Sequence, residues 1–403
     1  MPKQTLSAMT PNYNHARYIG RAIEAVVTQS RPPDEYLILD DASTDNSMEI
    51  IEHYASKYPF IRVLRNECNL GVLRSQARLV NEASGDYFYS GAADDFVRPG
   101  FFESAMDMAA KHAESGIIFG RVGIADENSN LIDVPPLCPE WTEPQYVPPD
   151  AFLKSYLHTR RPAHVISPTA AAVYKRSALD EVGGFRSELG FWADTFAIFA
   201  IALKYGLCYL HRHCATFHVM PESFGSTQMT NPAKLLEVVT AVASTMRSVE
   251  FRDRFPEEYV QDWKSDYDEI IANQCVHDAI EAFNDHQTTR YPELFDTAFR
   301  ASPHLFEYED AAVEWLLKGA MLPSVAAPYR FVSTVLSNLP ASAPHSLRVR
   351  RNRTIHFYLP LTRLRLQKAT RDWGVYASWL PHRIGNYCRR LLHGRSKSLP
   401  GAQ

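Results

Sequence analysis

Four groups of polar residues carry side chains that could do chemistry. They are the loop at residues 11–14, the acidic stretch at 40–45, the pair Asp94–Asp95, and the segment 183–194, which ends on Asp194. Carboxylates can bind a hard divalent cation, accept hydrogen bonds, or take up a proton as a nucleophile attacks. Whether these groups act together depends on the elements that position them.

The first 120 residues alternate short apolar runs with stretches of helical periodicity. Residues 6–9, 36–39, 61–64 and 86–89 predict strands, and the segments between them place apolar residues such as Ile19, Ile23 and Val26 on one helix face. This alternation is typical of βαβ units around a mainly parallel sheet. Three of the polar groups follow a predicted strand, at the edge where open α/β sheets bind ligands.

The rest of the chain is less regular. Residues 126–165 contain seven prolines and predict a long irregular excursion, whereas 167–174 and 208–218 predict strands and 195–205 a helix. Residues 232–336 are helical in pattern and acidic. We therefore divide the chain into a catalytic α/β domain at 1–230, a helical accessory region at 231–340 and a basic tail at 341–403.

Composition indicates a folded protein with an uneven charge distribution. Of 403 residues, 45% are hydrophobic and 22% charged, which excludes a largely disordered chain. The tail 341–403 holds thirteen Lys or Arg against one acid, which leaves 29 bases and 45 acids in residues 1–340. Scattered cysteines, no secretory signal and no long apolar stretch predict a cytoplasmic protein, with the inner face of the cell membrane as a further option.

Six short motifs, in order, resemble those of the family 2 inverting glycosyltransferases with the GT-A fold. They read Pro-Asn-Tyr-Asn at 11–14, Asp-Asp-Ala-Ser-Thr-Asp at 40–45, Asn-Leu-Gly at 69–71, Gly-Asp-Tyr at 85–87, Ala-Asp-Asp at 93–95 and Gly-Gly-Phe at 183–185. The likeness covers roughly residues 4–230. It implies a Rossmann-like, mainly parallel sheet flanked by helices, here followed by an α-helical C-terminal region.

The resemblance also implies roles for residues at the sheet edge. Asp95 would ligate a divalent cation, Mn²⁺ or Mg²⁺, which stabilises the diphosphate leaving group of a nucleotide-sugar donor, while Asp94 would face the ribose or the metal shell. Asp41 would accept a hydrogen bond from the nucleotide base, with Pro11 and Tyr13 packed around the ring. Asp40 could instead only orient its turn, and Asp45 or Ser43 could only cap a helix.

Two further residues complete the expected site. Asp194 matches the general base that removes the proton of the acceptor hydroxyl, although an N-cap carboxylate is the alternative. His218 matches a basic residue that reaches the diphosphate or metal, with an ordinary strand histidine as the alternative. The Cys and His residues at 208–218 alternate as in a strand, which argues against zinc.

The chain departs from the family pattern at three places. Ala92 stands where a first acid is common, Ala193 where Glu precedes the base, and Gln76–Ala77 where an Arg-Asn pair is common, with Arg74 and Arg78 nearby. The leading hypothesis is metal-dependent, inverting sugar transfer to a glycan or lipid-linked acceptor. The alternative is a non-catalytic nucleotide-sugar-binding or scaffold protein with the same fold, which Ala92 and Ala193 favour.

The tail offers a hypothesis about location. Basic side chains interleaved with aromatic residues and leucines at 356–365 could lie in an anionic membrane surface. A solvated or oligomer-facing tail is the alternative. We expect no nucleic-acid partner, because no motif that reads nucleic acid occurs.

Overall fold

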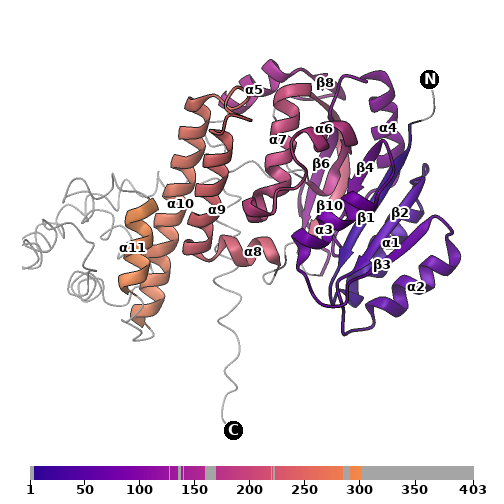
Figure 1. The fold of residues 1–403 in the computed structure, drawn as a ribbon, viewed down its shortest axis with the longest axis horizontal. Helices are drawn as coiled ribbons and strands as arrows, with labels where there is room; N and C mark the ends of the chain where they lie inside the picture. Colours follow the sequence, from indigo (N-terminus) through magenta and orange to yellow (C-terminus); the bar gives the residue numbers. More distant parts are fainter. Residues whose placement is uncertain are drawn as a thin grey trace, which may run out of the picture. The chain divides into compact units, whose positions relative to one another are not determined.

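A computed structural model describes residues 4–126, 128–134, 138, 140–158, 169–218, 220, 223–284 and 291–301. All residues after 301, the basic tail included, therefore lie outside the described residues. The chain divides into two compact units, Met1–Tyr267 and Asp268–Gln403. The first unit contains the sheet and every candidate site residue (Figure 1).

A single mixed sheet runs through the first unit. Its strands are β1 (Leu6–Asn12), β2 (Glu35–Asp40), β3 (Ile61–Arg65), β4 (Tyr87–Ser90), β5 (Phe96–Val97), β6 (Ile117–Ala125), β7 (Leu131–Asp133), β8 (Gln145–Val147), β9 (Ala172–Lys175) and β10 (Leu207–His218). The order is β3-β2-β1-β4-β9-β6-β10-β5, with β7 on β6 and β8 on β10. The fold class expected from the sequence is confirmed.

The first four strands in the chain form the parallel part of the sheet. β1 pairs in parallel with both β2 and β4, and β2 pairs in parallel with β3. β9 then joins β4 and β6 through antiparallel pairs, so the later half is mixed. Because β1 lies between β2 and β4, the loops that follow these strands meet at one edge of the sheet.

Helices flank the sheet and bury the apolar faces that the periodicity predicted. They are α1 (Ala16–Val27), α2 (Ser47–Lys57), α3 (Val72–Glu82), α4 (Phe101–Lys111), α5 (Pro149–His158), α6 (Arg176–Glu181) and α7 (Ala193–Tyr205). On α1 the residues Ile19, Ile23 and Val26 are buried, as spacing requires. α7 is almost entirely buried: α5 packs against it, and Phe251 and Phe255 contact its Phe196.

The proline-rich segment is more ordered than its composition predicted. Within residues 126–165 the structure contains β7, β8 and α5, so the expectation of an irregular excursion was wrong for those parts. Pro149 occupies the first position of α5, where its missing N–H costs nothing. Trp141 and Val147 are buried and anchor the segment to the core.

Two 3-10 helices, η2 (Thr169–Ala171) and η3 (Ser187–Trp192), come before β9 and before α7. The helices that follow β10 in the described residues are α8 (Phe224–Met229), α9 (Pro232–Met246), α10 (Glu257–Asn284) and α11 (Tyr291–Ala301). α9 packs against η3, and the start of α10 brings Trp263 beside Trp192 within the first unit. Among the described helices, none combines the length and apolar character needed to span a membrane.

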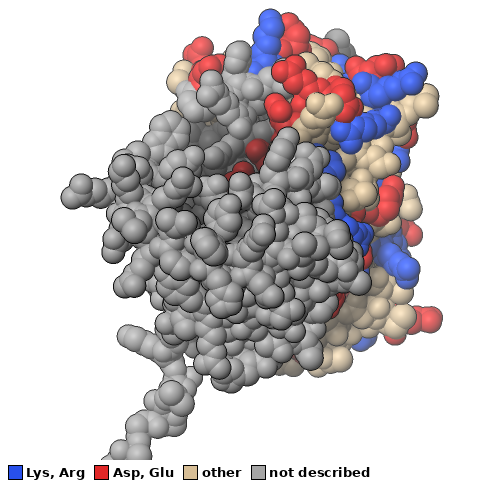
Figure 2. Space-filling view, turned by 90° about the vertical axis from the view of Figure 1, so that its left-hand side faces the viewer, with Lys and Arg blue, Asp and Glu red and all other residues tan. Residues whose placement is uncertain are grey.

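Charges of both signs cover the visible part of the surface. In Figure 2, basic and acidic side chains of the described residues lie interspersed. The described surface seen in this view therefore has no extended region of one sign.

Arg176 ties the end of α3 to β4, and its loss should destabilise the first unit. The guanidinium donates to the carbonyl of Ala83, the C-cap of α3, at 2.8 Å and to that of Gly85, between α3 and β4, at 2.7 Å. We expect Arg176→Met to lower the free energy of unfolding by about 1–3 kcal/mol in urea denaturation. Arg252→Met, which removes an exposed arginine 4.0 Å from Asp253, is the control and should change it by less than about 1 kcal/mol. Equal losses of unfolding free energy in the two variants would contradict the stabilising role of Arg176.

Candidate active site

The loops that follow β1 and β2 are joined by side-chain hydrogen bonds. The Asn12 amide donates to Asp40 and to Ser43, both at 3.1 Å, and the Asn14 side chain accepts from the Thr44 backbone N–H at 2.8 Å. Asn14 adopts a left-handed backbone with φ 55°. This network fixes the loop that carries Pro11 and Tyr13, and the Tyr13 side chain is left 41% exposed beside it.

Asp41 is buried, and protein donors hold its carboxylate. One oxygen accepts from the Asn66 amide at 2.6 Å and the Leu70 backbone N–H at 2.9 Å, and the other accepts from the Gly71 N–H at 2.9 Å. Three hydrogen bonds compensate for the burial of a charged group. They also leave acceptor capacity on the second oxygen, since a carboxylate offers about four lone-pair sites.

Asp40 and Asp45 have structural contacts, as the alternative interpretation proposed. Asp40 is fully buried and accepts from Asn12 and from the Ser43 backbone N–H. Asp45 accepts from the N–H groups of Ala16 and Ser47, which are the first residues of α1 and α2. Asp45 therefore satisfies the exposed N–H groups at two helix starts.

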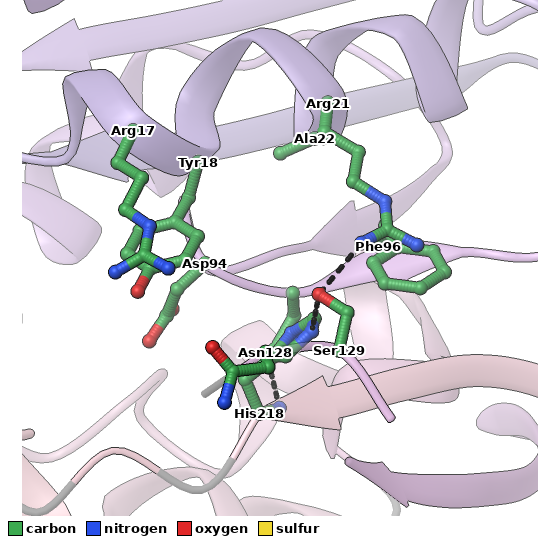
Figure 3. Close-up of a pocket in the computed structure, with 10 residues that line it drawn as sticks. Arg17, Tyr18, Arg21, Ala22, Asp94, Phe96, Asn128, Ser129 and His218 are labelled. Carbon is green, nitrogen blue, oxygen red and sulfur yellow. Dashed lines mark hydrogen bonds between the residues drawn. The ribbon is translucent and has the colours of Figure 1, made fainter. Parts of the chain in front are cut away.

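Asp94 and Asp95 follow β4 and line a pocket of about 210 Å³. Its other walls come from α1, from the turn between β6 and β7, and from the end of β10. In Figure 3 the Asp94 carboxylate points into the space below α1, and His218 also lies below that helix. The structure thus brings three of the predicted residues, Asp94, Asp95 and His218, into one pocket; the lining includes neither Asp41 nor Asp194.

Asp95 is an acid in an environment that disfavours its charge. Burial, followed by the neighbouring Asp94 carboxylate, raises the pKa of Asp95 well above its ordinary value, and the single bond from the His218 backbone N–H at 2.9 Å offsets this only in part. A bound cation would supply the missing compensation. The donor set fits a hard divalent cation held by carboxylate oxygen and completed by phosphate and water.

His218 is buried, and burial lowers the pKa of its imidazole. A lowered pKa favours the neutral ring, the form that can bind metal. Its Nε2 lies 2.9 Å from the Ser129 hydroxyl, and its Nδ1 is buried without a well-formed hydrogen bond among the described residues. No cluster of three or more His, Cys, Asp or Glu that could hold a metal occurs in the described part of the chain. A cation here would thus depend on its phosphate ligands.

Asp194 lies in the first turn of α7. Its carboxylate accepts from the backbone N–H of Thr195 at 2.7 Å, and burial raises its pKa to about 6. The residue before the helix is Trp192, so Asp194 is not the N-cap that the alternative interpretation required. A carboxylate with a pKa near neutrality is well matched to accept a proton.

The turn before Asp194 is held by residues from later helices. The Phe191 N–H donates to Gln228 of α8 at 3.1 Å, and the Trp192 indole donates to the Tyr267 hydroxyl at 2.6 Å. Gly190 has φ 54°, and a Cβ there would lie 2.6 Å from the Gln228 amide oxygen. The turn therefore needs glycine for both its backbone and its packing.

Sequence reasoning missed part of the pocket. Arg17, Arg21 and Ser129 line it, and the Arg21 guanidinium donates to the Ser129 hydroxyl at 2.8 Å. The spacing of Arg17 and Arg21 places both on one face of α1, a signal that could have been used. Ser129 gave no such signal, because its position depends on a turn with φ 64° that the sequence does not reveal.

The two arginines near Gln76, Arg74 and Arg78, differ in their contacts. Arg78 donates to the side chain of Asn66 and to the carbonyl of Arg65, whereas Arg74 is exposed. The Gln76 amide donates to the Ser90 hydroxyl at 3.1 Å and so links α3 to the end of β4. Neither Arg74 nor Arg78 lines the pocket of Asp94 and Asp95.

The fold and the acidic loops at its strand ends define a GT-A-type α/β domain. The Glycosyl transferase family 2 profile matches residues 7–183. Residues 7–183 are therefore a glycosyltransferase family 2 domain.

Named relatives and a solved structure agree with that assignment. An uncharacterised glycosyltransferase of Escherichia coli, YibD, is 38% identical over 104 residues, which cover 26% of this chain and 30% of YibD. An uncharacterised glycosyltransferase of Nostoc, alr2836, is 27% identical over 55% of this chain and 69% of its own. Residues 1–349 of S. aureus TarS, crystallised with UDP-GlcNAc, match 89% of this chain and 92% of that one at TM-score 0.50 and 18% identity. The chain spans less than a third of the length of YibD.

The raised pKa of Asp194 predicts how stability depends on pH. The folded protein holds the Asp194 proton up to about pH 6, whereas an unperturbed Asp releases it near 3.8. Folded protein therefore binds more protons between these values, and the contribution of Asp194 to stability falls as pH rises through this window. Urea unfolding of wild type and Asp194→Asn from pH 4 to 8 should show wild type losing stability relative to the variant up to about pH 6. Asp253→Asn, at a highly exposed acid, is the control; a relative gain for wild type would contradict the burial argument.

Proposed function

We propose that this protein is a metal-dependent, inverting glycosyltransferase that uses a nucleotide-diphosphate sugar. The observation that carries the proposal is the paired acid Asp94–Asp95 in a pocket at the sheet edge, inside the region that the family 2 profile matches. Asp41, Pro11 and Tyr13 lie on neighbouring loops of the same edge and are assigned to the nucleotide. The TarS structure with UDP-GlcNAc supports the choice of donor class, through the shared fold.

Asp95 and Asp94 are assigned to a divalent cation, Mn²⁺ or Mg²⁺, with His218 beside them. A cation at this place would stabilise the negative charge that develops on the departing diphosphate. The surrounding residues position the Asp95 carboxylate. One of its oxygens accepts from the His218 backbone N–H, and the buried His218 ring forms part of the pocket wall. Asp94, whose carboxylate points into the pocket, is assigned to the ribose or the outer metal shell.

Asp194 is assigned as the general base. Inversion at the sugar carbon requires an acceptor hydroxyl to attack opposite the leaving group, and a carboxylate within hydrogen-bond reach takes its proton. The pKa of about 6 leaves Asp194 mostly deprotonated at neutral pH, yet more basic than an exposed aspartate. The acceptor is proposed to be a glycan or a lipid-linked glycan.

The location proposed for the enzyme is the cytoplasm, at the inner face of the membrane. The basic tail at 341–403 would contact anionic lipid, with a solvated or oligomer-facing tail as the alternative. Loss of liposome binding on removal of 341–403 would support attachment, and unchanged binding would reject it.

A second candidate function is nucleotide-sugar binding without turnover. Ala92 and Ala193 favour it, because both replace acids common in the family. The raised pKa of Asp194 favours the enzyme instead, since a binding protein has no need of a poised base.

Nucleotide binding tests the proposal directly. We expect the melting temperature of the full chain to rise with one or more nucleoside diphosphates in the presence of Mn²⁺, since a ligand that binds only the folded state stabilises it by about 2.7 kcal/mol at a hundred times its Kd. UDP, GDP, ADP, CDP and TDP, each with Mn²⁺ or with EDTA, form the panel. No response to any of them would overturn the proposed donor class.

Asp95→Asn should abolish the contribution of the metal to this binding. The amide has no negative charge, so Mn²⁺ should no longer strengthen nucleotide binding, while the protein without metal should be at least as stable as wild type because the buried charge is gone. Titration calorimetry with and without Mn²⁺ measures the first effect and urea unfolding the second. Asp107→Asn, which changes an exposed acid on α4, is the matched control. Retention of the full Mn²⁺ effect would assign the cation elsewhere.

Asp194→Asn should separate catalysis from binding. The variant keeps the shape of the side chain but has no basic oxygen, so sugar transfer from the donor should slow by roughly 10²–10⁴-fold. Its Kd for the nucleoside diphosphate should stay within about twofold of wild type, because Asp194 does not line the pocket of Asp94 and Asp95. Release of nucleoside diphosphate from the donor measures the rate. Turnover equal to wild type would rule out Asp194 as the base.

A further inference from the structure

A chain of buried hydrogen bonds runs from α3 to the Asp41 carboxylate. Arg78 donates to the side-chain oxygen of Asn66, and the Asn66 nitrogen donates to Asp41 at 2.6 Å and to the Ser75 hydroxyl at 3.1 Å. Asn66 is 5% exposed and Asp41 3%. Little water therefore reaches the polar atoms that connect the guanidinium to the carboxylate.

The chemistry of the three groups fixes the orientation of Asn66. An arginine can only donate hydrogen bonds, and an ionised aspartate can only accept them. Asn66 lies between them, so its oxygen must face Arg78 and its nitrogen must face Asp41. Reversing the amide would place two acceptors together on one side and two donors on the other.

The same contacts fix the direction of the Asp41 carboxylate. Asn66 and the Leu70 N–H occupy one oxygen, and the Gly71 N–H binds the other from the start of α3. The second oxygen is left with an unused lone pair. A carboxylate held in this way presents a single acceptor direction at the sheet edge.

We propose that Asn66 and Arg78 are positioning residues that aim Asp41 at an N–H donor on the base of the nucleotide. This inference rests on the proposed function and deepens it, because it states what the base must offer: a ring N–H like that of uracil or guanine. Arg78 acts through Asn66 and does not touch the nucleotide. Its positive charge also lowers the cost of holding the Asp41 charge away from water.

A purely structural role makes a different prediction. If Arg78 only anchors α3, its loss weakens every ligand at the sheet edge, or none. If it aims Asp41, its loss weakens a ligand that has a base and spares one that has only phosphates. Inorganic pyrophosphate provides that comparison, since it can bind Mn²⁺ at Asp94 and Asp95 but has no base for Asp41.

The experiment measures Kd by titration calorimetry for UDP, GDP and pyrophosphate, all with Mn²⁺, on the full chain. Arg78→Met keeps the length of the side chain and removes its donors, and Asn66→Asp tests the same link from the other end. Arg78→Lys restores a cationic donor. Arg62→Met is the matched control, because Arg62 also bonds to α3, through the carbonyl and carboxylate of Glu82 at its far end. Thermal melts check that each variant folds.

We expect Arg78→Met and Asn66→Asp to weaken the better-bound nucleoside diphosphate on the order of tenfold, which corresponds to about 1.4 kcal/mol, and to leave pyrophosphate within about twofold. Arg78→Lys should recover part of the loss, and Arg62→Met should match wild type. Equal weakening of both ligands, or no change in either, would overturn the positioning role.

If Arg78→Met fails to fold, Asn66→Asp decides. Wild type that binds pyrophosphate but neither nucleotide would overturn the base site, and wild type that binds none of the three would overturn the proposed function itself.

Discussion

Burying a carboxylate is costly, and this protein meets that cost differently at the two pairs of acids on its sheet edge. Asp40 and Asp41 follow β2 and receive their compensation from the protein, through Asn12, Asn66 and several backbone N–H groups. Asp95 follows β4, is buried to a similar extent, and receives one backbone hydrogen bond beside a second acid. This difference in compensation is why the proposed cation is assigned to Asp95 and not to Asp41.

The sequence alone could not have drawn that distinction. Both places read as Asp-Asp after an apolar strand, and strand periodicity correctly located them at the same sheet edge. The donors that differentiate them come from residues that are distant in the chain: Asn66 lies 25 positions from Asp41, and His218 lies 123 positions from Asp95. Local patterns predicted strands and helices well because local sequence determines them, whereas the hydrogen bonding depends on how those elements pack.

Glycine and backbone geometry explain other differences between expectation and structure. Ser129 enters the pocket from a turn with positive φ that carries no glycine, so no residue type announced it. The prolines at 126–165 suggested irregular chain, yet Pro149 begins a helix because a proline fits at its first position. Composition indicated where turns occur and did not indicate which ordered elements lie between them.

Helices that begin at or after residue 224 help to position Asp194. Gln228 and Tyr267 hold Phe191 and Trp192, and so they set the start of the helix that carries Asp194. Ala193 is buried at this helix start. A glutamate in its place would put a second charge beside Asp194, whose pKa burial already raises to about 6. Asp194 is the one acid in the first turn of α7, so its pKa is set by its own burial and by the hydrogen bond from the Thr195 N–H.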